Sequence, residues 1–289
     1  MRHGPLYLIA AALLWSLSGA FVKGPVLRAL PATSAGLTIA FYRALFAALA
    51  LLPLVRRRRI RWRPALVPMV VSFAAMNFLF VSAMTLTTAA NAILLQYTAP
   101  LWMFLASVTL LGEPFERRSL VALGFGMAGV GVILAASLRT PEALGVVLGL
   151  ASGLAYAGVA VCLRVLRDED PTVLVVLNHA ASALVLIPWV ILYSPLPTPG
   201  QWATLAAFGI VQMAIPYVLF ARGLKTVSPQ EAGAITLLEP ILNPIWVYLV
   251  CHESVGGATF VGGVFIVAGL LSRYVPLRRS VYRLRSQRG

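Results

Sequence analysis

Long apolar runs, separated by short polar or basic stretches, make up most of this chain. An α-helix needs about 20 apolar residues to cross the hydrocarbon core of a bilayer. Runs of this kind predict ten transmembrane helices, at residues 5–22, 34–55, 65–85, 89–111, 119–137, 144–164, 173–193, 202–222, 228–250 and 255–274. Five of them fall on either side of residues 139–143. Residues 5–20 also fit a signal peptide, but its removal would leave the first half one span short.

The second half of the chain faintly repeats the first, at one constant offset of 140 residues. The register aligns three informative pairs: Phe80 with Phe220, Pro100 with Pro240, and Glu113 with Glu253. Two copies of an odd number of spans lie in opposite orientations, which is the plan of many secondary transporters. We therefore predict an all-α polytopic membrane protein with ten transmembrane helices in two inverted five-helix repeats. The repeats are residues 1–138 and 139–274, followed by a basic cytoplasmic tail at 275–289.

Composition and charge agree with a membrane protein. Hydrophobic residues make up 60% of the chain and charged residues 11%, and the mean hydropathy is +0.88. Soluble domains carry about 25% charged residues, so this composition excludes a soluble fold. The net charge is +14, and most basic residues fall in cytoplasmic loops if both termini are cytoplasmic, as the positive-inside rule requires. The basic run at 56–63 is then a topology signal that also contacts anionic membrane lipid, and we expect no nucleic-acid partner.

Motifs for other classes of protein are weak or absent. The sequence Gly-Phe-Gly-Met-Ala-Gly at 124–129 fits a dinucleotide-binding pattern, but that site requires a loop between a strand and a helix. Here the glycines lie inside an apolar span, where small residues let helices pack closely. The sequence contains no hydrolase or ATP-binding motif and no His/Cys cluster that predicts a metal site. We therefore expect no cofactor, no metal and no enzymatic activity.

Titratable residues within the predicted spans are candidates for function, because burying a charge in lipid is costly. Arg43 and Glu239 are the charges nearest to span centres. They form a structural ion pair or contact polar groups of a substrate, so we predict a coupling or ion-pair role for both. His179 is the third candidate for this role, and the alternative is an interior histidine with satisfied hydrogen bonds.

Four aromatic residues lie near the middle of their spans: Trp15, Tyr97, Tyr156 and Tyr217. Aromatic belts lie at the ends of spans, so these four have another role. They fill the core or face lipid, or they line a half-polar cavity at the midplane, where indole and phenol groups find hydrogen-bond partners. We predict that they contact the substrate together with Asn77 and Asn243.

Prolines recur within the spans. Pro100 and Pro240 take equivalent positions in spans four and nine, Pro244 follows one turn later, and Pro216 lies in span eight. Proline removes a backbone hydrogen bond and bends a helix. We therefore predict kinks at these four positions and a role for them in gating.

A family resemblance rests on two stretches of the chain. Residues 94–113, with Pro100-Leu101 and the closing Gly112-Glu113, precede a Gly-rich fifth span. This stretch resembles the EamA domain of the drug/metabolite transporter superfamily, and so does the second copy with Pro240-Ile241 and Glu253. The resemblance covers two tandem domains, residues 6–137 and 144–273. His252 stands in place of the family's usual glycine, so we expect that loop to turn less tightly.

By this resemblance the protein would be a multi-pass exporter or exchanger of small-molecule metabolites in the bacterial inner membrane, with both termini cytoplasmic. Leu14-Trp15-Ser16 and Gln96-Tyr97 suggest the branch of YddG-like exporters of aromatic and other amino acids. Exporters of threonine, cysteine derivatives or drugs share the general pattern. Spans one, three, four, six, eight and nine would line a midplane cavity with alternating access, in a monomer or loose homodimer surrounded by membrane lipid.

Two questions stay open at this point. One central carboxylate and one histidine allow proton antiport, exchange and facilitated diffusion alike. Other classes of function also remain. A membrane-embedded enzyme acting on a lipid or lipid-linked substrate needs a nucleophile or paired acids at one interface. A helper protein needs neither central polar residues nor repeat-matched prolines.

Overall fold

The computed structural model of the protein describes residues 3–55, 62–111, 117–227 and 229–274. Most of the basic run, Glu113 and the tail at 275–289 lie outside the described residues. The described part of the first half holds α1 (Gly4–Trp15), α2 (Ser18–Lys23), α3 (Pro25–Arg28), α4 (Ala35–Leu51), the 3-10 helix Leu52–Leu54, α5 (Leu66–Leu86), α6 (Ala89–Gln96), α7 (Ala99–Leu111) and α8 (Arg117–Ser137). The second half holds α9 (Ala143–Val165), α10 (Pro171–Tyr193), α11 (Pro199–Ala207), the π-helical segment η2 (Phe208–Ala214), α12 (Ile215–Gly223), α13 (Pro229–Thr236), α14 (Leu238–Cys251) and α15 (Gly257–Tyr274).

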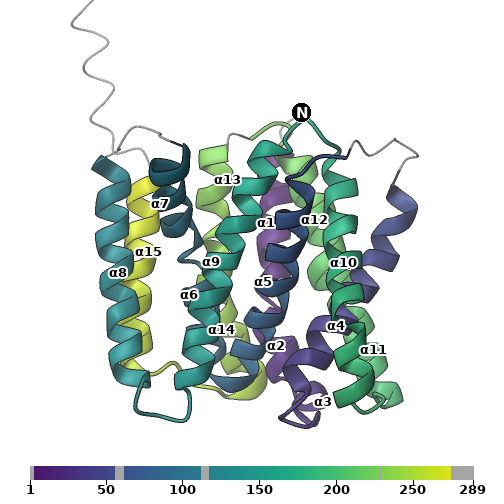
Figure 1. Ribbon diagram of the computed structural model, residues 1–289. Coiled ribbons are helices and arrows are strands. Elements are labelled where there is room, and N and C mark those ends of the chain that lie inside the picture. The colour runs from purple at the N-terminus through teal and green to yellow at the C-terminus, as the bar shows by residue number, and fades with distance from the viewer. Residues whose placement is uncertain (1–2, 56–61, 112–116, 228, 275–289) are drawn as a thin grey trace, which may run out of the picture.

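These helices form a bundle of membrane-spanning length (Figure 1). Within the described residues, nine helical segments are long and apolar enough to cross a membrane: Gly4–Lys23, Ala35–Leu54, Leu66–Leu86, Ala89–Ala106, Ser119–Ser137, Ala143–Val165, Pro171–Tyr193, Pro199–Gly223 and Glu231–Cys251. They coincide with the first nine predicted spans. A further apolar helix, Gly257–Ser272, is shorter and coincides with the tenth. The prediction of an all-helical polytopic membrane protein is confirmed.

The largest buried cluster lies where the two halves of the chain meet. It takes Ile39 from α4, Val81 from α5, Leu95 from α6 and Phe208 from η2, all with 0% exposed surface. Around it α5 lies along α9 and α4 along α10, and elsewhere α1 lies along α12, so helices of the first half pack largely against helices of the second. In lipid such packing is stabilised by close van der Waals contact.

At one edge of the bundle α8 pairs with α15 (Figure 1). A Cβ atom added to Gly262 of α15 would lie 2.7 Å from the carbonyl oxygen of Gly129 in α8. Only a residue without a side chain therefore allows the two backbones to come this close. The interpretation of the glycines at 124–129 as a packing surface agrees with this contact.

Three spans are interrupted near their middle: the first between α1 and α2, the fourth between α6 and α7, and the ninth between α13 and α14. Pro100 is the second residue of α7 and Pro240 the third of α14, and each leaves the carbonyl oxygen four residues earlier without its helical N–H donor. Each proline thus follows directly on an interruption of its span, and the role of both in gating stays a prediction. Pro216 is the second residue of α12, directly after η2, whereas Pro244 lies inside α14.

Helix bounds recur along the chain at the offset of the sequence repeat. The helices α6 and α13 both begin and end 140 residues apart, and α8 and α15 begin 140 residues apart. The interruptions in spans four and nine therefore fall at corresponding positions of the sequence register.

The loop after α14 turns at His252. This residue takes the left-handed conformation, with φ 55° and ψ 25°. It is the conformation in which glycine commonly ends a helix. The expectation of a less tight turn here is therefore wrong, because histidine adopts the backbone geometry that the family's glycine would provide.

Candidate substrate-binding site

The break in the first span is held by side chains from spans eight and nine. Gln212 of η2 donates from Nε2 to the carbonyl oxygen of Trp15 (3.1 Å). Asn243 of α14 donates from Nδ2 to the Ser18 hydroxyl (2.8 Å). The end of a helix leaves backbone carbonyls without intrahelical partners, and Gln212 supplies a donor for one of them.

The breaks in spans four and nine meet at Tyr97. Its hydroxyl donates to Oε2 of Glu239 (2.7 Å) and lies 2.9 Å from the carbonyl oxygen of Thr236. In a continuous helix this carbonyl would accept from the backbone N–H of residue 240, but Pro240 has no N–H. The proline therefore leaves the Thr236 carbonyl available to Tyr97.

Aromatic rings form a chain beside the first break. The Trp15 ring lies 5.4 Å from the Tyr217 ring, which lies 5.6 Å from His179, which in turn lies 4.9 Å from Phe73. All three pairs meet edge to face, a favourable arrangement for aromatic rings. The structure thus brings together three residues, Trp15, Tyr217 and His179, that the sequence proposed separately.

Several buried polar atoms in this region have no hydrogen-bond partner among the described residues. They are Oε1 of Gln212, Oδ1 of Asn243 and both ring nitrogens of His179. Gln212 is 3% exposed and the other two side chains 0%, and leaving such a group unpaired costs roughly 1–3 kcal/mol. Two of these atoms, the amide oxygens of Gln212 and Asn243, are acceptors on the side chains that hold the first break.

Asn77 is bound to Arg43 rather than standing free for a ligand. Its Oδ1 accepts from Nε of Arg43 (2.7 Å), and its Nδ2 donates to the hydroxyl of Ser182 (3.0 Å). The Arg43 guanidinium also lies 5.4 Å from the ring centroid of Phe208. In the described part of the chain, no ion pair joins Arg43 to Glu239. Arg43, Asn77 and Ser182 therefore link α4, α5 and α10 through one buried network.

The remaining predicted residues have the following places in the fold. Tyr156 of α9 has 42% of its surface exposed. Pro216 follows η2, the segment that carries Gln212. Pro244 comes one residue after Asn243 inside α14. Two of the predicted gating prolines therefore adjoin the segments whose side chains hold the first break.

The break in the first span was not predicted from the sequence. A second side chain of α14, Trp246, donates from Nε1 to the Ser16 hydroxyl there (2.9 Å). The available signal was the run Ser-Leu-Ser-Gly at 16–19, because serine and glycine form helices less readily than alanine or leucine. Gln212 is one of the polar residues that the sequence places within spans, but it was not selected as a substrate contact, because the π-helical segment that carries it has no comparable sequence pattern.

A separate polar group lies near α3, at the end of the bundle opposite the N-terminus (Figure 1). Nζ of Lys23 lies 3.2 Å from Oε2 of Glu253 and donates to the carbonyl oxygen of Thr87 (2.7 Å). Oε1 of Glu253 accepts from the backbone N–H of Ala89 at the start of α6 (2.8 Å), where a negative charge is favoured by the helix dipole. These four residues, the opposite-face cluster, tie together α2, α6 and the α14–α15 loop.

The sequence model of the EamA-like transporter family matches residues 2–135 and again residues 143–273. The chain belongs to this family. An uncharacterised transporter of Archaeoglobus fulgidus is 30% identical over 279 residues, covering 94% of this chain and 96% of that protein. The pseudopaline exporter CntI of Pseudomonas aeruginosa is 25% identical, with 94% and 96% coverage. The aromatic amino acid exporter YddG of Ancylobacter novellus is 26% identical over 70% of this chain and 73% of that protein.

A solved crystal structure also shares the fold of this EamA-like transporter. It aligns with a TM-score of 0.68 at 22% sequence identity, over 96% of this chain and 98% of that one. The resemblance to the EamA family drawn from the sequence is confirmed, and the protein is a multi-pass membrane transporter.

Proposed function

We propose that this EamA-like transporter is a secondary exporter of small amphipathic metabolites, with aromatic amino acids as the leading substrates. The observation that carries the proposal is the meeting of the Trp15 and Tyr217 rings with the unpaired acceptors of Gln212 and Asn243 at the first break. An aromatic amino acid offers both complementary parts, because its ring is apolar and its ammonium group has three N–H donors. The relative named as an aromatic amino acid exporter supports this substrate class.

The proposed architecture is ten transmembrane helices in two inverted five-helix repeats, in a bacterial inner membrane with both termini cytoplasmic. Helix bounds that recur 140 residues apart support the repeat. The two separate matches to the EamA family support it as well. Under this topology the N-terminal end of the bundle faces the cytoplasm, and the opposite-face cluster faces outward.

Transport in this proposal is by alternating access, and the opposite-face cluster is the closed outer gate. Opening it separates Lys23 from Glu253 and takes the carboxylate acceptor away from the N–H of Ala89. The breaks in spans four and nine give these spans points at which they can bend, and interrupted helices mark the binding region in many transporters. The contact of Tyr97 with Glu239 couples the two bending points.

Counterflow in proteoliposomes tests this function. Vesicles that contain the purified protein and unlabelled phenylalanine should accumulate external labelled phenylalanine, whereas vesicles preloaded with aspartate should not. Failure to accumulate any aromatic amino acid would refute the substrate class. Chemical conversion of the vesicle lipid without solute flux would instead support the membrane-embedded enzyme. An imposed pH gradient that raises the accumulation would identify proton antiport as the energy source.

A further inference from the structure

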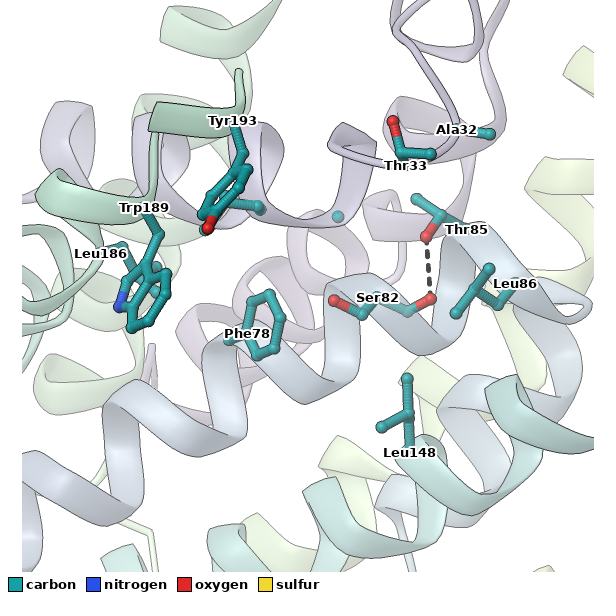
Figure 2. Close-up of a pocket in the computed structure, with 12 residues that line it drawn as sticks. Ala32, Thr33, Phe78, Ser82, Thr85, Leu86, Leu148, Leu186, Trp189 and Tyr193 are labelled. Atoms are coloured by element: carbon teal, nitrogen blue, oxygen red, sulfur yellow. Dashed lines mark hydrogen bonds between the residues drawn. The ribbon is translucent and has the colours of Figure 1, made fainter. Parts of the chain in front are cut away.

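A cavity of about 460 Å³ opens between the two halves of the chain, lined by residues outside the proposed substrate site. Its walls come from the start of α4, the C-terminal half of α5, one turn of α9 and the end of α10. Figure 2 shows Phe78, Trp189 and Tyr193 along one side, facing Thr33 and Thr85 on the other. Its volume is within the ~300–1,000 Å³ that ligand pockets typically have.

Two exposed aromatic side chains, Trp189 and Tyr193, stand at the mouth of the cavity. Trp189 and Tyr193 are 53% and 64% exposed, and their rings stack with centroids 6.1 Å apart. Both lie in the last turns of α10, and tryptophan and tyrosine at the end of a span mark the membrane interface. The mouth of the cavity therefore lies at the level where acyl chains meet the headgroups.

The chemistry of the lining fits an uncharged chain rather than an amino acid. Among the described residues that line the cavity, none is acidic or basic. A zwitterion would bring two charges without partners, which is costly in an apolar setting. The hydroxyl of Thr85 donates to the carbonyl oxygen of Ser82 in its own helix (2.8 Å). The remaining surface is mostly ring and aliphatic carbon, which gains dispersion contacts from a hydrocarbon chain.

We propose that this cavity binds one acyl chain of a membrane phospholipid between the two halves of the transporter. Its inner end adjoins the buried network, because Phe78 follows Asn77 and Leu186 lies one turn after Ser182 in α10. Asn77 and Ser182 are hydrogen-bonded across α5 and α10 (3.0 Å). The acyl chain contacts both helices beside this bond, so its affinity depends on how the halves are placed relative to each other.

Photo-crosslinking of the full-length protein in phosphatidylethanolamine vesicles tests the site. The probe is phosphatidylethanolamine with a diazirine in one acyl chain, and mass spectrometry locates the labelled residues. We expect labelling at Phe78 and Leu186 that saturates with probe and is reduced by unlabelled phospholipid. Equal labelling at Leu184 and Ile191, which are 66% and 75% exposed on the same helix, would show bulk lipid only and overturn the proposal. Competition by phenylalanine alone would also overturn it, by assigning the cavity to the solute.

A matched pair of variants on α9 sharpens the test. Leu148→Trp places a larger ring in the cavity, whereas Val147→Trp, at a neighbouring position that is 48% exposed, places it in lipid. Displacing about two methylene groups of the acyl chain should weaken labelling of Leu186 roughly tenfold in the first variant only. Leu86→Trp, at a 38% exposed position of the lining, fills the cavity from α5 if Leu148→Trp does not fold. Undiminished labelling in the folded filling variants would refute the site.

Discussion

Lys23 and Glu253 form an ion pair of 3.2 Å that joins the end of the first span to the loop after the ninth. Their side chains are 18% and 24% exposed, and a pair that is partly open to solvent contributes about 1 kcal/mol at most. The second carboxylate oxygen of Glu253 also accepts from the N–H of Ala89. The Glu253 carboxylate therefore contacts both Lys23 of α2 and the start of α6. A substitution can remove the ion pair and keep an acceptor for the hydrogen bond.

Glu253→Gln should open this face of the transporter less than Glu253→Ala does. Glutamine removes the charge but keeps an oxygen for the N–H of Ala89, whereas alanine removes both interactions. The measurement is the rate at which a membrane-impermeant maleimide labels Val22→Cys, a position that is 3% exposed, in a background without native cysteines. We expect a rise of roughly fivefold for the alanine variant, equivalent to about 1 kcal/mol. Arg139→Gln, which removes a charge from the α8–α9 loop, is the control, and equal rates in all variants would contradict the gate.

Asn77→Leu should destabilise the protein by about 3 kcal/mol, because it leaves the buried guanidinium of Arg43 without its acceptor. Thermal unfolding in detergent measures this change. Ser182→Ala, which removes only the hydroxyl that accepts from Asn77, should cost about 1 kcal/mol. If Asn77→Leu kept the unfolding temperature and lost only solute affinity, Asn77 would instead be the substrate contact that the sequence predicted.

Trp15→Ala should raise the half-saturating concentration of phenylalanine in counterflow by roughly threefold to tenfold, the size of one aromatic contact. Its ring meets Tyr217 and Phe220 and lies beside the acceptors at the first break. Trp202→Ala is the matched control, because that ring packs on Tyr42 instead. An equal change in both variants would mean that Trp15 acts on the fold and not on the solute.

Pro240→Ala should slow turnover more than it weakens binding. The new backbone N–H at residue 240 competes with the Tyr97 hydroxyl for the carbonyl oxygen of Thr236. Span nine then gains a helical bond across its break, which opposes bending. The test compares maximal rate with half-saturating concentration in vesicles, and Pro188→Ala, at a proline inside α10, is the control. Unchanged maximal rate would remove Pro240 from the gate.

Glu239→Gln separates charge from hydrogen bonding at the same break. The glutamine oxygen can still accept from Tyr97, so a purely structural Glu239 predicts transport close to that of the unchanged protein. Loss of accumulation driven by a pH gradient, with exchange preserved, would assign the carboxylate to proton coupling. Loss of both activities with an unchanged unfolding temperature would place Glu239 in solute binding.

The membrane helices were predictable from the sequence because twenty-odd apolar residues in a row leave few alternatives in lipid. The positions of the spans, the family and the glycine packing of α8 followed from such local patterns. The partners of polar residues did not. Arg43 and Glu239 are the charges nearest to span centres, yet each is bound to a neutral side chain, Asn77 and Tyr97. Such pairings depend on how distant helices pack, which a linear pattern does not encode.

Helix breaks were predictable from the sequence only in part. Pro100 and Pro240 marked two of the interruptions, because a missing N–H leaves the carbonyl four residues earlier without its helical donor. The break after Trp15 contains no proline at all. It depends on Gln212, a donor supplied from nearly two hundred residues further along the chain.

The contact between Gly129 and Gly262 restricts how the two halves can move. The backbones approach again at Gly269 of α15, where an added Cβ would lie 2.9 Å from the carbonyl oxygen of Ala122 in α8, so the two helices are packed along their length and we expect them to move as one unit. Gly262→Leu would push α8 and α15 apart. A single substitution at this edge of the bundle, far from the proposed solute site, should therefore slow transport.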